Sequence, residues 1–157
     1  MADVRADGIA VYVWRWANQP GGDIELLQIR RSGKTGEYQH SWQIVYGGIN
    51  PGEKAYQTAQ RELLEETALV ARAMHQVEYL ESFYFMPHDY VLIMPVFAAR
   101  VDHGDAITLN EEHDAYRWVH ERDVPTHFMW RTQREAVRFV LESIRTPSAA
   151  APMLKVI

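Results

Sequence analysis

Alternating apolar and polar positions in the first third of the chain predict a β-rich start. The β-branched and aromatic run from Gly8 to Trp16 predicts a strand, and the turn-forming cluster from Asn18 to Asp23 separates it from a second strand, Ile24 to Arg30. These two strands are expected to form a hairpin. The polar stretch from Ser32 to Ser41 is expected to be a loop, and the apolar stretch Trp42 to Tyr46 a short strand.

A change from strand-like to helical spacing follows. The stretch from Gly47 to Gly52 predicts a tight loop, because glycine adopts backbone angles that other residues avoid. Lys54 to Thr67 contains good helix formers and no glycine or proline. Tyr56, Ala59 and Leu63 recur at helical spacing, which predicts that they face the core.

The second half of the chain repeats the mixture of strands and helices. Two strands are predicted from Val77 to Met86 and from Tyr90 to Val101, followed by a short strand from Ala115 to Val119. Helical spacing returns from Trp130 to Ile144, whereas the Ala- and Pro-rich residues 147–157 are expected to be a loose tail. Residues 1–157 therefore predict one mixed α/β domain.

Composition narrows the class of protein. The chain has 157 residues, of which 47% are apolar and 24% charged, which is typical of a globular domain. The absence of cysteine excludes disulfides and thiolate chemistry. No signal peptide or membrane span is visible, so we expect a cytoplasmic protein. The net charge of −5 makes broad binding to nucleic acid backbones unlikely as a function.

Three carboxylates on the first predicted helix are the main candidates for chemistry. Glu65 and Glu66 follow Glu62 by three and four positions, so all three lie within a sector of about 100° beside the apolar stripe. Like charges at these spacings repel, and a dication among them removes the repulsion. Carboxylate oxygens suit Mg²⁺ or Mn²⁺, which activate water and neutralise phosphoryl charge.

Glutamate clusters on helices are usually solvated faces, so the carboxylates alone do not decide between surface and site. The preceding loop favours a site, since Gly47 stands six residues before Glu53 and Glu53 stands eight before Arg61. A glycine loop that leads into a helix brings backbone groups close to a metal or phosphate.

The residues from Gly47 to Leu69 read G-x5-E-x7-R-E-L-L-E-E-T-A-L. This segment resembles the Nudix box, G-x5-E-x7-R-E-U-x-E-E-x-G-U, where U is a bulky aliphatic residue. The only mismatch is Ala68 in place of the last glycine, for which we expect an altered helix end rather than lost chemistry. The resemblance implies a Nudix-like α/β/α sandwich with a mixed central β-sheet, and a hydrolase of phosphoric anhydride bonds.

The resemblance also implies roles for single residues. Glu62, Glu65 and Glu66 would be the main metal ligands, with a backbone ligand at Gly47 or its neighbour. One of the glutamates would act as the base, and Arg61 would orient glutamates such as Glu53.

Two flanking segments resemble those of bacterial dihydroneopterin triphosphate pyrophosphatases, which also act on dATP. They are the lead-in WQIVYGG from Trp42 and the stretch EHDAYRW from Glu112. The second makes Glu112 a candidate metal ligand or base. Tyr46 departs from the usual threonine, so the substrate remains open between a pterin triphosphate and a deoxynucleoside triphosphate.

Two alternatives stand beside this interpretation. The segment GGINPGE from Gly47 is also similar to RNA pyrophosphohydrolases and dinucleoside polyphosphate hydrolases, although the net charge of −5 is unfavourable for a protein that meets RNA. A non-catalytic nucleotide-binding module of the same fold is the other alternative, but such modules typically lose glutamates of the box. Family members are often dimers, which makes a homodimer possible.

Several residues are candidates for substrate binding. Guanidinium groups suit phosphates, and aromatic rings stack on planar bases or pterins, although strand-end arginines and core aromatics are common without such roles. The candidates are Arg30, Arg31, Trp42, Gln43, Phe83, Tyr84 and Tyr90.

Overall fold

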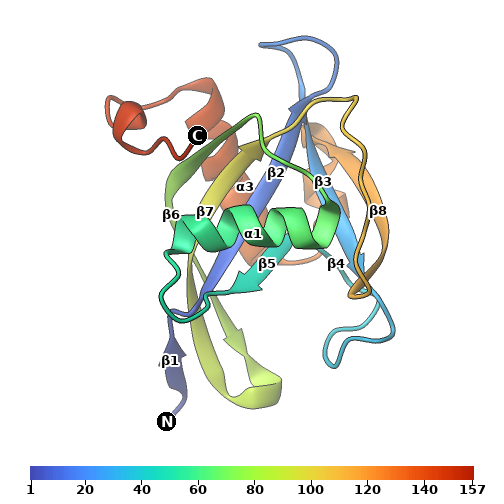
Figure 1. The fold of residues 1–157 in the computed structure, drawn as a ribbon, viewed down its shortest axis with the longest axis vertical. Helices are drawn as coiled ribbons and strands as arrows, with labels where there is room; N and C mark the ends of the chain where they lie inside the picture. Colours follow the sequence, from blue (N-terminus) through green and yellow to red (C-terminus); the bar gives the residue numbers. More distant parts are fainter.

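The computed structural model describes residues 1–157 and contains a mixed eight-stranded sheet with helices on both faces (Figure 1). The α/β class and the sandwich expected from the sequence are confirmed. The elements in chain order are β1 Asp3–Arg5, β2 Gly8–Trp16, β3 Ile24–Arg31, β4 Trp42–Gln43, β5 Val45–Gly48, α1 Ala55–Thr67, β6 Ala73–Phe85, the 3-10 turn η1 Met86–His88, β7 Tyr90–Arg100, β8 His113–His120, η2 Glu121–Asp123, α2 Val124–His127, α3 Arg131–Arg145 and η3 Ala151–Met153.

The path through the sheet runs β1-β7-β2-β3-β4, with β5 also paired to β2, β6 to β7 and β8 to β3. Strands β2 and β7 are parallel, whereas β2 and β3 form the expected antiparallel hairpin. The pairing of β8 with β3 places His113 opposite Arg31. This pairing carries the EHDAYRW segment to the side of the sheet where β3 ends.

Alternation along β2 divides the core into two layers. Ile9, Val11 and Val13 pack on the layer that includes Ala59 and Leu63 of α1. The intervening residues of β2, from Ala10 to Trp14, pack on the layer under α3. Because both faces of the sheet are covered, β2 is buried over most of its length.

The buried face of α1 differs from the predicted one. Ala59 and Leu63 are fully buried, but Tyr56 is 40% exposed. Ala68 ends the helix with φ +61°, and its N–H donates to the carbonyl oxygen of Leu64 at 2.8 Å. The helix therefore keeps the left-handed cap that glycine normally supplies, so the expected altered helix end is not observed. An alanine in this conformation costs on the order of 1 kcal/mol.

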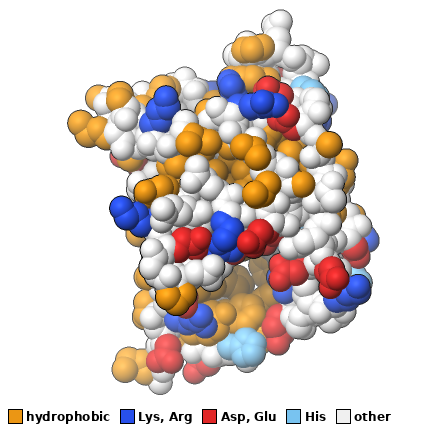
Figure 2. Space-filling model, in the orientation of Figure 1, with side chains coloured by type: hydrophobic (Ala, Val, Ile, Leu, Met, Phe, Trp, Pro, Cys, Tyr) orange, Lys and Arg blue, Asp and Glu red, His pale blue; other side chains and the backbone are white.

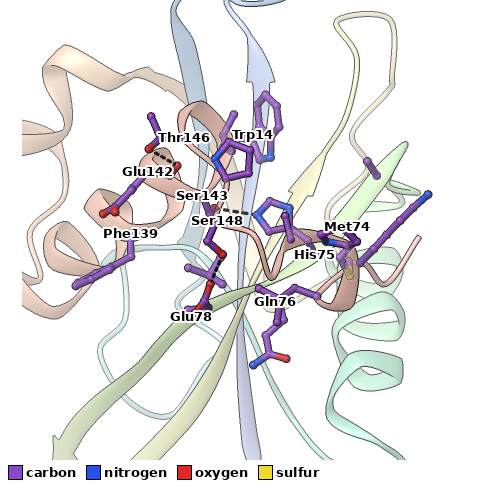
Figure 3. A pocket seen from close by; sticks show the side chains of 18 of the residues that line it. Trp14, Met74, His75, Gln76, Glu78, Phe139, Glu142, Ser143, Thr146 and Ser148 are labelled. Atoms are coloured by element: carbon purple, nitrogen blue, oxygen red, sulfur yellow. Dashed lines mark hydrogen bonds between the residues drawn. The ribbon is translucent and has the colours of Figure 1, made fainter.

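The expectation of a loose tail at residues 147–157 is wrong. The N–H groups of Val156 and Ile157 donate to the carbonyl oxygen of Met74 at 2.8 and 3.2 Å, and the Ser148 hydroxyl donates to Glu78 at 2.9 Å (Figure 3). Alanine and proline content suggested mobility, but the open edge of β6 supplies backbone partners that composition does not reveal. The tail, β6 and α3 enclose a cavity of about 650 Å³.

No helix combines the length and the apolar composition that crossing a membrane requires.

Candidate metal and substrate site

Arg61 lies at the centre of an ion-pair network on α1. Its Nε and Nη2 donate to the two carboxylate oxygens of Glu53 at 2.8 and 3.0 Å. Its Nη1 donates to Glu62 at 2.7 Å and to Glu65 at 3.1 Å, and Nη2 also donates to the carbonyl oxygen of Gly48 at 2.9 Å. The hydrogen bonds from Arg61 are the main reason that the pKa of Glu53 is lowered to about 2. Arg61 thus ties α1 to the loop before it and to β5.

Gly47 lies in β5, paired with Ile9 of β2, rather than in the predicted tight loop. Of the glycines in that stretch, Gly52 is the one with positive φ, at +80°. The requirement at Gly47 is space, because a Cβ there would lie 2.1 Å from Cγ and 2.5 Å from Oε1 of Glu62. Glu62 therefore packs flat against the strand, and burial raises the pKa of its carboxyl.

Glu66 differs from the other carboxylates of α1 because it is buried, with 4% of its surface exposed. It stands three residues after Leu63 and so continues the apolar stripe, which corrects the prediction that all three glutamates lie beside that stripe. Its Oε2 has no hydrogen-bond partner. Burial raises the pKa of Glu66 well above its usual range, and the charges of Glu62 and Glu112 add to the effect.

Glu112 and His113, at the start of β8, approach Glu66 from the other side. One potential ligand atom from each of these three residues lies within 4.8 Å of the other two. His113 is 8% exposed, and burial is the main cause that lowers its pKa to about 4. Sequence analysis missed His113, since no second histidine stands at a metal-binding distance along the chain.

The groups at this position fit a divalent cation. They are carboxylate oxygens and an imidazole, which are ordinary ligands of divalent metals. A buried carboxylate oxygen without a partner is costly, and a cation would satisfy it. Glu62 and Glu65 lie close enough to affect the pKa of Glu66 electrostatically, so the negative charge of α1 converges on the same place.

A cleft of about 610 Å³ begins at these carboxylates and extends to a wall of aromatic rings. Figure 2 shows a hollow in the lower half of one face, with acidic side chains along its upper rim and hydrophobic side chains inside it. The lining includes Glu62, Glu66 and Glu112 at one end and Phe83, Phe85, Tyr90 and Trp130 at the other.

Two rings of the aromatic wall, Phe83 and Phe85, come from β6. Phe83 and Phe85 alternate with Tyr84, so the two phenylalanines face the cleft while Tyr84 points away and donates its hydroxyl to Asp89 at 2.9 Å. Trp130 meets Phe83 edge to face, with ring centroids 5.6 Å apart. Phe85, and not the predicted Tyr84, is therefore one of the rings that line the cleft.

The two arginines at the end of β3 have different surroundings. Arg31 lines the cleft, and its Nε donates to the carbonyl oxygen of Glu37 at 2.8 Å. Arg30 points elsewhere and pairs with Asp114 at 2.7 Å. The alternation of a strand separates these neighbours, which the sequence alone left equivalent.

Trp42 and Gln43, which are neighbours in β4, also have different surroundings. Gln43 lines the cleft. The Trp42 ring instead lies outside it, with the guanidinium carbon of Arg117 4.1 Å and that of Arg30 5.8 Å from its centroid. Cation–π contact accounts for this position of the tryptophan.

A chain of hydrogen bonds lies beneath the cleft. The Gln133 amide donates to Gln43 at 2.9 Å and to the Tyr46 hydroxyl at 3.1 Å, and Tyr46 donates to buried Glu81 at 2.8 Å. Tyr12 also donates to Glu81, at 3.2 Å. Burial raises the pKa of Glu81 to about 7. The tyrosine that departs from the resembled motif is thus anchored from below, a role that the sequence did not reveal.

The comparison with protein families agrees with the fold. The family model described as NUDIX domain matches residues 6–140, so the chain belongs to the Nudix family. Nudix hydrolases act on phosphoric anhydride bonds and generally use a divalent metal.

The individual relatives match only part of this chain. The chain is 34% identical over 109 residues to an octanoyltransferase of Myxococcus xanthus, covering 68% of this chain and 28% of that protein. It is 53% identical over 45 residues to an RNA pyrophosphohydrolase of Serratia proteamaculans, covering 29% of this chain and 23% of that protein. The chain therefore spans less than a third of the length of these curated relatives.

Among solved structures, the E. coli dihydroneopterin triphosphate pyrophosphohydrolase has a similar fold. The TM-score is 0.69 at 22% identity, over 90% of this chain and 99% of that one. This likeness establishes a shared fold.

Proposed function

We propose that the protein is a metal-dependent pyrophosphohydrolase of small triphosphates that carry an aromatic ring, either a pterin triphosphate or a deoxynucleoside triphosphate. The continuity of the cleft carries the proposal, because carboxylates, among them the buried Glu66, line one end and aromatic rings the other. A triphosphate attached to a planar heterocycle matches both ends, with the phosphates beside the cation and the ring on Phe83, Phe85 or Trp130.

In this proposal Glu62, Glu65, Glu66 and Glu112 hold Mg²⁺ or Mn²⁺, with a backbone contribution at Gly47. When bound, such an ion orients water and neutralises negative charge on phosphate oxygens. The chain itself supplies a carboxylate that accepts a proton from the attacking water, for which Glu62, Glu65 and Glu112 are the candidates. No covalent intermediate is required.

Two arginines have separate tasks in this scheme. Arg61 acts as a positioning residue, since its donors hold Glu53 and orient the side chains of Glu62 and Glu65. Arg31 lines the cleft near Glu66, where its guanidinium is placed for a phosphate of the substrate.

Hydrolysis of RNA 5′ ends or of dinucleoside polyphosphates is the second candidate. It is favoured by the short segment with 53% identity to an RNA pyrophosphohydrolase. The net charge of −5 and the acidic rim of the cleft oppose binding of a polyanionic chain (Figure 2). A non-catalytic module is less well supported because every glutamate of the box is present.

A side-by-side substrate panel tests the proposal. Dihydroneopterin triphosphate, dATP, diadenosine tetraphosphate and 5′-triphosphorylated RNA are compared at equal concentration with Mg²⁺, and the released pyrophosphate or phosphate is identified. We expect the first two to give the highest kcat/KM with release of pyrophosphate. A preference for RNA or diadenosine tetraphosphate would establish the second candidate, and binding without turnover would establish the module.

A pair of variants on β6 tests the aromatic end of the cleft. Phe85→Leu removes a ring that lines the cleft, and we expect KM for the preferred substrate to rise about 10-fold, since an aromatic contact contributes on the order of 1 kcal/mol beyond its buried area. Tyr84→Leu is the matched control on the opposite side of the strand and should leave KM unchanged. Equal effects of the two variants would exclude Phe85 as a substrate contact.

A further inference from the structure

We propose that His113 is a nitrogen ligand of the divalent cation, together with Glu66 and Glu112. The inference rests on the proposed function only in assuming that a cation binds at this site. Binding is measurable without turnover, so the two proposals fail separately.

The first support is the geometry of the three residues. Their potential ligand atoms lie within 4.8 Å of one another, so a cation between them would lie within about 2–3 Å of each. Glu66 and His113 are buried, and Glu66 Oε2 has no hydrogen-bond partner in the structure. A buried carboxylate without a partner, next to an imidazole and a second carboxylate, is an arrangement that a cation completes.

The second support is the anchoring of the histidine. Asn110 Oδ1 lies 3.3 Å from His113 Nδ1 and also accepts the backbone N–H of Glu112 at 3.2 Å. Because this oxygen is an acceptor, the ring donates Nδ1–H and leaves the lone pair on Nε2. Metal-binding histidines are commonly held by such a bond from the second ring nitrogen, which fixes both tautomer and orientation. Asn110 thus holds the His113 ring and the backbone of Glu112, the residue just before β8.

An imidazole changes which cation the site prefers. A purely carboxylate site suits Mg²⁺, whereas imidazole suits later divalent metals. We therefore expect the protein to bind Co²⁺ and Ni²⁺ more tightly, relative to Mg²⁺, than it does once His113 is replaced.

Electron spin-echo spectroscopy of the Mn²⁺-loaded protein is the direct test, because ¹⁴N modulation reports a coordinated imidazole. At one equivalent of Mn²⁺ we expect this modulation in the wild-type protein and in the exposed-histidine control His127→Asn, but not in His113→Gln. Ni²⁺ affinity should fall about 10–100-fold in His113→Gln, with a much smaller fall for Mg²⁺. Absence of ¹⁴N modulation in the wild-type protein would overturn the proposal.

A second measurement does not depend on the stability of a variant. In ¹⁵N-labelled wild-type protein, the imidazole nitrogen resonances of each histidine are followed by NMR during titration with Zn²⁺. We expect His113 to shift by far the most, and an unshifted His113 in the saturated protein would overturn the proposal. Hydrolysis without these nitrogen signals would leave the proposed function intact, whereas nitrogen signals without hydrolysis would leave the ligand assignment intact.

Discussion

The carboxylates of α1 and its neighbours form two groups, one around Arg61 and one around Glu66, and the two groups differ in their electrostatic surroundings. Around Arg61, the carboxylates of Glu53, Glu62 and Glu65 accept hydrogen bonds from the guanidinium. Around Glu66, a buried carboxylate oxygen has no partner, and the neighbouring Glu112 is acidic too. The first group carries its own cation as part of the chain. The second group has no such partner in the chain, and in our proposal a cation from solution takes that place.

The largest loss of activity is expected from a change in the group around Glu66. Glu66→Gln keeps the shape of the side chain but removes its charge, so we expect kcat/KM to fall by at least about 100-fold. The rise in melting temperature on addition of Mn²⁺ should disappear with it. Glu142→Gln on the exposed side of α3 is the isosteric control. A Glu66→Gln protein that Mn²⁺ still stabilises as strongly as wild type would show that the cation binds elsewhere.

Gly47→Ala tests the connection between the two groups, because Glu62 contacts Arg61 and also packs against this glycine. The new Cβ would overlap Glu62 Cγ at 2.1 Å, so the carboxylate must move. We expect kcat to fall by about 10–100-fold with the fold retained, as misplacement by about 1 Å has such consequences. Gly48→Ala meets its nearest atom at 3.9 Å and should have a much smaller effect. Equal losses in steady-state assays of the two variants would contradict this account of Gly47.

Variants of Arg31 and Arg30 compare a side chain that lines the cleft with a neighbour on the surface outside it. Arg31→Ala removes a cation that faces the cleft, and we expect KM to rise about 10-fold through a lost charge-assisted contact with phosphate. Arg30→Ala loses an exposed pair with Asp114 and a contact with the Trp42 ring, both outside the cleft, and should leave KM near the wild-type value. A larger change in KM for Arg30→Ala would reverse the assignment.

The smallest effect concerns the pH dependence of the group around Arg61. Because the pKa of Glu53 is lowered to about 2 in the folded protein, its ionised form stabilises the fold. This contribution is fully present above the unfolded pKa, about 4.3, and is lost as pH falls toward 2. The difference in melting temperature between wild type and Glu53→Gln should therefore be constant from pH 6 to 8 and shrink below pH 4. A difference that stays constant down to pH 2 would show that Arg61 does not stabilise the ionised form.

The sequence predicts most of the strands, both long helices and the carboxylates of α1, because these depend on local periodicity and on one long motif. It does not separate Phe85 from Tyr84 or Arg31 from Arg30, since the face that each neighbour occupies depends on strand register. His113 reaches its position through the pairing of β8 with β3, and Glu81 meets Tyr12 and Tyr46 from strands distant in the sequence. Such contacts leave no local pattern in the chain.

The pairing of the carboxyl-terminal residues with β6 has a consequence for handling the protein. Without residues 154–157, the N–H and carbonyl groups of Met74 and the N–H of Gln76 would lie along an unprotected sheet edge. Exposed edges of this kind recruit strands from other molecules and start aggregation. Residues 154–157 therefore shield this edge of the sheet from self-association, and a preparation that lacks them should aggregate more readily.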